Sequence, residues 1–179
     1  MFLTQTALPG AMLIDLELKP DSRGFFARTF CREELSQAGL DPMVEQCGVA
    51  YNHLAGTVRG MHFRLPPAAE AKLVRCTRGA ILDIIVDMRP DSSTYVQHVA
   101  VELTADNRRA LYVPPMFAHG YQTLADATEV SYQFSERYTP ELERGLRFDD
   151  PALALPWPMP VTIVSDKDQE WPLMQTTAR

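Results

Sequence analysis

Apolar and polar residues alternate in short runs along most of the chain, and this period of two is typical of half-buried β-strands. In residues 12–18, for example, Ile14, Leu16 and Leu18 alternate with two acidic residues. Further along, turn residues separate apolar-rich runs, and the pattern predicts strands over residues 44–51, 57–64, 72–77, 80–88, 95–103, 110–113, 120–124 and 128–134.

The regular spacing of these runs predicts an all-β fold, an antiparallel sandwich or jelly roll formed by residues 1–179 as a single domain. A few short helices are expected, mostly near the C-terminus. One helix is expected earlier, over residues 31–38, because Gly39 follows it where a left-handed cap would end it. After the last strand comes a proline-rich segment, which we expect to pack irregularly across the sandwich.

Charge and cysteine content narrow the class of protein. With 17 Lys and Arg against 23 Asp and Glu, the formal net charge is −6, which disfavours a general nucleic-acid or anionic-membrane binder. The longest uncharged stretches, residues 110–125 and 151–165, are broken by prolines and shorter than the roughly 18 apolar residues of a membrane span. Cys31, Cys47 and Cys76 form no CxxC pair, so we expect buried free thiols and a cytoplasmic protein.

Basic residues gather on two of the predicted strands, which indicates an anionic ligand in this acidic protein. Arg59 and His62 share one strand, and Lys72 opens the next. Regular alternation would point Arg59 and His62 to opposite faces, unless Gly60 introduces a bulge that redirects one of them. An inward-facing lysine such as Lys72 is costly unless it has a partner or a function.

The pattern leaves the roles of single residues open. His62 is either a functional imidazole or a core histidine satisfied by a hydrogen bond. Tyr132 shares the parity of core residues, so it is either a core tyrosine with a paired hydroxyl or a functional phenol. His98 is expected to lie at the surface, His53 lies beside a turn, and neither is expected to have a function.

A metal enzyme is the first alternative. Metal-dependent sandwich enzymes use two histidines one residue apart, and the chain has no such pair, although His62, His119 and a carboxylate could still meet in space. Hydrolysis by a Ser-His-Asp triad has no support, because no GxSxG motif occurs.

Ordered motifs along nearly the whole chain resemble the dTDP-4-dehydrorhamnose 3,5-epimerase family. They run from DSRGFF at residues 21–26 to Pro172 and include GTVRGMHF at 56–63, KLVRCTRG at 72–79, VDMR at 86–89, FAHG at 117–120, WP at 157–158 and SDKD at 165–168. The resemblance implies a metal-independent cupin jelly roll without a cofactor, usually a homodimer with strand exchange. Its substrate would be a nucleotide-linked 4-keto-6-deoxy sugar, epimerised at carbon 3, carbon 5 or both.

The same resemblance implies roles for the unusual residues. His62 would take the proton next to the ketone, Asp168 would orient the imidazole, Lys72 would contact the carbon 4 oxygen, and Tyr132 would return a proton on the opposite face. Further family positions would bind the substrate: Arg59 and Arg23 the diphosphate, and His119, Gln46, Phe26 and Tyr138 the sugar or the base. Phe26 is expected to come from the partner subunit.

Two departures from the family pattern leave the nucleotide open. Arg28 stands where the family commonly has a glutamate near the nucleotide, and of the family's usual Gln-x-Asn-x-Ser segment only Gln46 is kept. Three other functions stay open beside the epimerase: a non-catalytic cupin that binds a sugar nucleotide, a keto-sugar isomerase that moves the carbonyl, and a metal-dependent cupin enzyme.

Overall fold

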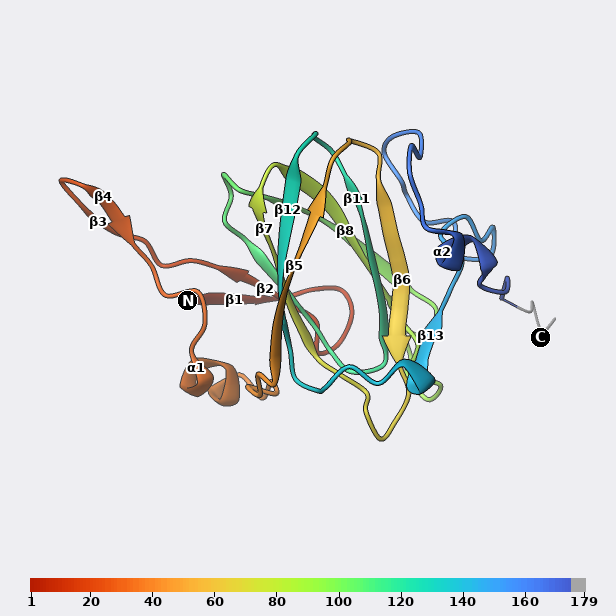
Figure 1. Cartoon of the computed structure of the whole chain (residues 1–179). Helices are drawn as coiled ribbons and strands as arrows, with labels where there is room; N and C mark the ends of the chain where they lie inside the picture. Colours follow the sequence, from red (N-terminus) through yellow and green to blue (C-terminus); the bar gives the residue numbers. More distant parts are fainter. Residues whose placement is uncertain (175–179) are drawn as a thin grey trace.

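Two antiparallel β-sheets form a sandwich in the computed structural model, which describes residues 1–174 (Figure 1). One sheet has six strands in the order β1-β2-β10-β7-β12-β5, with bounds Phe2–Gln5, Met12–Asp15, Ala110–Val113, Lys72–Arg78, Thr128–Phe134 and Gln46–Asn52. The other has five strands in the order β13-β6-β11-β8-β9, with bounds Glu143–Gly145, Val58–Arg64, Phe117–Thr123, Ala80–Asp87 and His98–Thr104. The predicted antiparallel β-sandwich is confirmed.

The main core lies between the two sheets. Val74 of β7 and Val130 of β12 belong to one buried cluster with Ile85 of β8 and Phe117 of β11. Each of these side chains contributes about 1.5 to 3 kcal/mol when it is fully buried. The apolar side chains that the alternation directs inward therefore stabilise the packing of the two sheets.

A second cluster lies on the outer face of the five-stranded sheet, under the irregular C-terminal segment. Leu153 and Trp157 of that segment pack with Met61 of β6 and Ile84 of β8. The indole nitrogen of Trp157 also donates a hydrogen bond of 2.6 Å to the carbonyl of Phe148. The prediction that this segment packs across the sandwich is confirmed.

Strand bounds agree with the prediction for β10, which is a continuous apolar run, and for β12, in which apolar and polar residues alternate. The strand expected from residue 95 begins only at His98, because a turn from Thr94 to Gln97 precedes it. Helix α1 (Arg32–Gln37) matches the predicted helix, with Gly39 at a φ of 74°. Among residues 1–174, no helix is long and apolar enough to cross a bilayer.

The short helices expected near the C-terminus are present as η1 (Pro140–Leu142) and α2 (Asp166–Glu170). Four short strands had no counterpart in the prediction, because three or four residues are too few to show an alternation of their own. They are β1, β13 and the hairpin strands β3 (Lys19–Asp21) and β4 (Gly24–Phe26).

The expectation of buried thiols is wrong for two of the three cysteines. Cys76 is buried, but Cys31 is half-buried and Cys47 is exposed. Cys47 lies on β5, the edge strand of the six-stranded sheet, and its neighbour Gln46 lines a cavity between the sheets. Alternation therefore places Cys47 on the outer face of the sheet.

The hairpin of β3 and β4 projects from the sandwich on the side opposite α2 (Figure 1). Phe25 and Phe26 at its end are 45% and 69% exposed. Two neighbouring exposed aromatic residues on a projecting hairpin suit contact with another protein surface.

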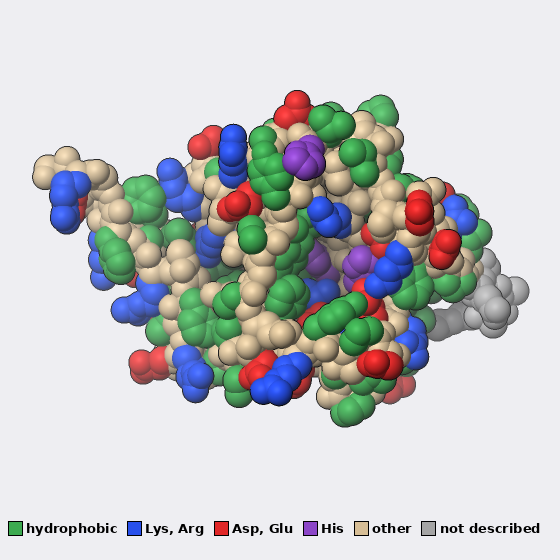
Figure 2. Space-filling view, in the orientation of Figure 1, with side chains coloured by type: hydrophobic (Ala, Val, Ile, Leu, Met, Phe, Trp, Pro, Cys, Tyr) green, Lys and Arg blue, Asp and Glu red, His purple; other side chains and the backbone are tan. Residues whose placement is uncertain are grey.

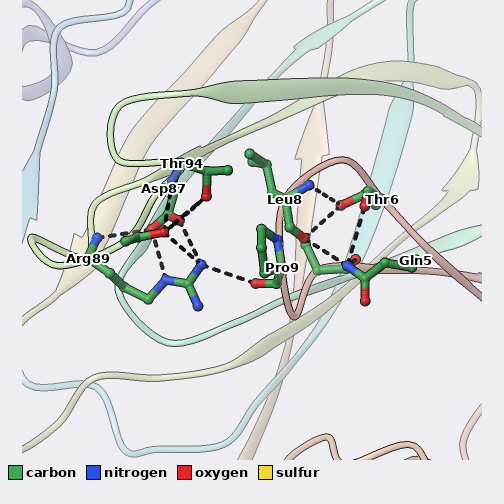
Figure 3. A network of polar contacts seen from close by, with 9 residues as sticks. Gln5, Thr6, Leu8, Pro9, Asp87, Arg89 and Thr94 are labelled. Carbon is green, nitrogen blue, oxygen red and sulfur yellow. Dashed lines mark hydrogen bonds and ion pairs between the residues drawn. The ribbon is translucent and has the colours of Figure 1, made fainter.

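A fully buried carboxylate, that of Asp87 at the end of β8, organises the loop that follows (Figure 3). It accepts hydrogen bonds from Arg89 (2.6 Å), Ser92 (2.6 Å) and Thr94 (2.7 Å). Arg89 also donates to the carbonyl of Pro9, so the network ties the loop between β1 and β2 to the sandwich. Burial raises the pKa of Asp87, but these hydrogen bonds outweigh it and hold the pKa well below 3.8.

We expect Asp87→Asn to lower the free energy of unfolding by about 3 kcal/mol at neutral pH, because it leaves buried donors without their charged acceptor. The folded-state pKa is depressed, so this stabilisation is complete above the ordinary value of 3.8 and is lost as pH falls below it. Urea unfolding at several pH values measures both effects.

The matched control is Asp149→Asn, which removes a half-exposed carboxylate paired with Arg147. Its effect should stay within about 1 kcal/mol. Equal losses in the two variants, or a loss from Asp87→Asn that grows with acidity, would contradict the prediction.

Candidate active site

A cleft opens between the two sheets, and histidine and basic side chains gather in the hollow between β5 and β6 (Figure 2). The cleft consists of a cavity of about 440 Å³ and an adjoining cavity of about 270 Å³. Both cavities are lined by His62, Lys72 and Phe134. The first also reaches Arg59, and the second ends at Tyr138. The two cavities form one continuous site.

His62 of β6 forms a short hydrogen bond with Asp168 of α2, with 2.5 Å between Nε2 and Oδ1. Asp168 is 3% exposed, and its second oxygen accepts a bond from the amide of Gly60. Ser165 caps the helix by accepting from the Asp168 amide. Burial raises the pKa of Asp168, but the hydrogen bond from His62 outweighs it and lowers the pKa. The carboxylate therefore stays charged and fixes the imidazole ring.

A bulge in β6 brings Arg59 and His62 to the same cleft. His62 pairs with His119 of β11, whereas Arg59 pairs with Tyr121, so β6 has one extra residue between the two positions. Gly60 makes this possible with a φ of 108°, and a Cβ atom there would lie 2.5 Å from the His119 carbonyl oxygen. The bulge that the sequence suggested at Gly60 is confirmed.

Glu143 of β13 lies on the other side of the His62 ring, 4.0 Å from Nδ1. Its carboxylate accepts hydrogen bonds from the Tyr138 hydroxyl (2.9 Å) and the Lys167 ammonium (2.7 Å). Sequence reasoning missed Glu143 and Lys167. Lys167 lies within the SDKD motif that includes Asp168, so its position was a usable signal, but Glu143 lies in a three-residue strand without any recognisable pattern.

Lys72 and Tyr132 line the cleft from neighbouring strands of the six-stranded sheet, β7 and β12. Burial, reinforced by the charge of Arg64, lowers the pKa of Lys72 to about 8. Burial also raises the pKa of the Tyr132 phenol well above 10, and the nearby Tyr121 adds to this effect. At neutral pH the lysine is largely an ammonium and the phenol keeps its proton.

A second histidine–carboxylate pair lies deeper in the cleft. His119 is 5% exposed and its Nε2 lies 2.6 Å from Oδ1 of Asp83. The His119 ring centroid is 6.1 Å from that of Tyr132. Each of the two cleft histidines thus has its own carboxylate, and within residues 1–174 no three His, Cys, Asp or Glu side chains converge as a group of metal ligands.

The predicted diphosphate ligands are separated in this chain. Arg59 lines the cleft and donates to Asn52 (2.8 Å) and to the Tyr51 carbonyl (3.2 Å). Arg23 lies on the projecting hairpin, where its side chain is 88% exposed and pairs with Asp21. Phe26 lies on the same hairpin. The structure therefore does not bring Arg23 and Phe26 to the cleft of their own chain.

The remaining predicted residues, Gln46 and Tyr138, line one end of the cleft. The Gln46 side chain accepts a hydrogen bond of 2.8 Å from the Tyr138 amide. Arg28, which departs from the family pattern, lies outside this cleft and pairs with Glu34 at 3.0 Å. The charge reversal at Arg28 is thus balanced within the chain.

The cleft combines a fixed imidazole, a buried ammonium and a neutral phenol. An imidazole can remove a proton, a cation can stabilise the resulting enolate oxygen, and a phenol can donate a proton. His62 comes from the five-stranded sheet and Tyr132 from the six-stranded sheet, so the two side chains line the cleft from opposite walls.

Comparison with known proteins identifies the family. Residues 5–176 match the family described as dTDP-4-dehydrorhamnose 3,5-epimerase. An enzyme of that name from Sinorhizobium fredii is 39% identical over 96% of this chain and 89% of its own. The crystal structure of the Bacillus anthracis enzyme, with TDP and pyrophosphate bound, has a TM-score of 0.93 at 40% identity and covers 97% of this chain and 99% of its own.

Relatives named for a single inversion are also similar. A 3′-monoepimerase from Streptomyces bikiniensis in complex with dTDP-quinovose has a TM-score of 0.86 at 32% identity, over 94% of this chain and 85% of its own.

The family match over residues 5–176 and the similarity to enzymes of that name show that the chain belongs to the dTDP-4-dehydrorhamnose 3,5-epimerase family, and it is an isomerase with the cupin-like jelly roll of that family.

Proposed function

We propose that this enzyme inverts carbon 3 and carbon 5 of a dTDP-linked 4-keto-6-deoxyhexose, with His62 as the base and Tyr132 as the acid. The observation that carries the proposal is the placement of these two residues on opposite walls of one cleft. Inversion requires that a proton leave one face of the sugar ring and return to the other.

In the first step, His62 removes the proton from the carbon next to the ketone through the ring nitrogen that is not bound to Asp168. The electron pair of the C–H bond moves into the ring, and the carbon 4 oxygen becomes an enolate oxygen. The Lys72 ammonium stabilises this negative charge, because the buried cleft strengthens the interaction between opposite charges. Asp168 stabilises the imidazolium that forms.

In the second step, the Tyr132 hydroxyl donates its proton to the opposite face of the same carbon. The ketone re-forms, and the configuration is inverted. Exchange with solvent then restores the proton on Tyr132 and removes the one on His62. Substrate and product are isomers, so the cycle consumes no cofactor.

Inversion at both carbons has its support in the relatives. Enzymes named 3,5-epimerase are 33% to 39% identical to this chain, and the enzyme of Streptomyces niveus named dTDP-4-dehydrorhamnose 3-epimerase is 33% identical. Both carbons flank the same ketone, so a single base and a single cation can serve both in turn.

Replacing His62 by Ala should abolish proton removal at both carbons. In deuterated water, the wild-type enzyme is expected to place deuterium at carbon 3 and carbon 5 of the dTDP-4-keto-6-deoxy sugar, as measured by NMR or mass spectrometry. In His62→Ala, both exchange rates should fall by a factor of about 10³ or more.

The control is His53→Asn, which changes an exposed histidine near a turn and should leave both rates unchanged. Exchange at carbon 3 alone in the wild type would reduce the function to a single inversion. Undiminished exchange in His62→Ala would remove the proposed base.

Replacing Tyr132 by Phe should separate proton loss from inversion, because the acid acts only after the enolate has formed. Deuterium exchange on the original face should fall by about tenfold or less, whereas formation of the inverted product should fall by about 10² or more. Chiral analysis of the recovered sugar measures both in one reaction. Equal losses in the two rates would be incompatible with an acid role for Tyr132.

We also propose that the projecting hairpin completes the cleft of a second copy of the chain. Phe25, Phe26 and Arg23 are exposed on this hairpin and lie away from their own cleft. In a homodimer, Arg23 of one copy would join Arg59 of the other at the diphosphate, where guanidinium groups bind phosphate oxygens with paired hydrogen bonds.

Arg23→Ala is therefore expected to weaken dTDP binding by about tenfold, the effect of losing one charge-assisted contact. Calorimetric titration measures the affinity for dTDP, and light scattering should show a dimer for the wild type and for Arg23→Ala. Arg147→Ala, which removes an arginine paired with Asp149, is the control and should bind dTDP normally. A monomer in solution, or unchanged affinity in Arg23→Ala, would exclude this arrangement.

A further inference from the structure

Three charged side chains are buried in a row at the base of the cleft. Arg64 at the end of β6, Glu70 before β7 and Lys72 at its start are 3%, 9% and 7% exposed. The Arg64 guanidinium forms an ion pair with Oε2 of Glu70. It also donates hydrogen bonds to the carbonyls of Glu136 and Arg137. The other oxygen of Glu70 lies 3.4 Å from the Lys72 ammonium. One carboxylate therefore joins two cations.

Stability alone does not account for this row of charges. Removing charges from water is costly, and apolar residues that replace a buried ion pair are often as stable or more stable. All three side chains line the cleft, and the row ends at Lys72, the cation placed for the ketone oxygen. Its location thus points to a role in catalysis.

The Lys72 ammonium is also held in place. It donates a hydrogen bond of 3.2 Å to the carbonyl of His62 and contacts Glu70. An ammonium has three N–H groups, so these two contacts leave one for a ketone oxygen. The carbonyl of His62 belongs to the proposed base residue, so the same contact keeps the cation close to that residue.

Other charged and titratable groups on neighbouring strands line the cleft with Lys72 or act on its charge. They are His62 on β6, Asp83 on β8, His119 on β11, Tyr132 on β12 and Glu143 on β13. Asp83 and Glu143 raise the pKa of Lys72, whereas burial and Arg64 lower it to about 8. Glu70 contacts both Arg64 and Lys72, and its charge is opposite to that of Arg64, so the two groups act on the Lys72 ammonium in opposite directions.

We propose that Glu70 and Arg64 are positioning residues that hold the Lys72 ammonium at the ketone and set its charge state by opposing effects. Glu70 favours the charged ammonium, and Arg64 limits that effect by occupying the other carboxylate oxygen and adding a like charge. The outcome is an ammonium that is charged at neutral pH yet able to share a proton with the enolate oxygen. This inference rests on the proposed function, because it assumes that Lys72 contacts the ketone.

The test compares Glu70→Gln with Arg64→Met. Loss of Glu70 should lower the pKa of Lys72 by about one unit, and loss of Arg64 should raise it by about one unit. The pKa is measured directly by NMR titration of the ¹⁵Nζ signal of Lys72, assigned by its absence in Lys72→Met. The alkaline limb of the pH profile of deuterium exchange should move in the same two directions, because the ammonium is lost as pH rises through its pKa.

Further readouts separate positioning from a merely structural role. Glu70→Gln should reduce kcat by about tenfold with KM within about twofold of the wild type, and Glu70→Asp, which keeps the charge, should recover most of the loss. Glu45→Gln, which removes a carboxylate from the exposed pair with Arg137, should leave the Lys72 titration unchanged.

Arg64→Met leaves Glu70 buried without its arginine, so the double variant Arg64→Met/Glu70→Gln covers the case in which the single variant does not fold. Because the two effects oppose each other, the pKa of Lys72 in the double variant should lie within about half a unit of the wild-type value. Shifts in the same direction for both single variants, or a shift above one unit in the double variant, would overturn the inference. If the Lys72 pKa shifts in opposite directions but the pH profile of deuterium exchange does not move, Glu70 and Arg64 do set the charge of Lys72. That outcome would refute the proposed contact between Lys72 and the ketone.

Discussion

The hydrogen bond between Asp168 and His62 is the contact on which the site depends. It joins α2, the last helix of the described chain, to β6 in the middle of the sequence. The same carboxylate accepts from the amide of Gly60, so it also fixes the bulge beside the histidine. One buried carboxylate thereby controls the ring orientation, the local path of the strand and the position of the C-terminal helix.

The sandwich divides the proposed catalytic residues between its two sheets. The five-stranded sheet carries His62 and His119, each held by its own carboxylate, and the six-stranded sheet carries Lys72 and Tyr132. A sheet is rigid, and its side chains alternate in direction, so groups on facing sheets keep a constant separation across the cleft. An enzyme that must act on both faces of a ring gains this geometry from the fold itself.

The fold could be predicted from the sequence wherever a strand has a clear pattern of its own. β10 is a short apolar run between two arginines and two prolines, β12 alternates apolar and polar residues, and both begin and end where predicted. The glycine in β6 correctly indicated a bulge. The C-terminal helix α2 could not be predicted by periodicity, because five residues are too short to show a helical period. The strand that carries Glu143 is shorter still, and its place against β6 depends on residues far away in the sequence.

The bulge at Gly60 also makes the site depend on one residue that carries no functional group. Arg59 and His62 are three residues apart, so a regular pleat would point them to opposite faces, and the extra residue of β6 brings both to the cleft. A Cβ atom at position 60 would meet the carbonyl oxygen of His119 at 2.5 Å, and the φ of 108° is one that only glycine adopts readily. A distant descendant of this enzyme could therefore retain all its ionisable residues and yet be inert after exchange of this single glycine. Inventories of ionisable side chains would not reveal such a loss, but the residue next to the arginine would.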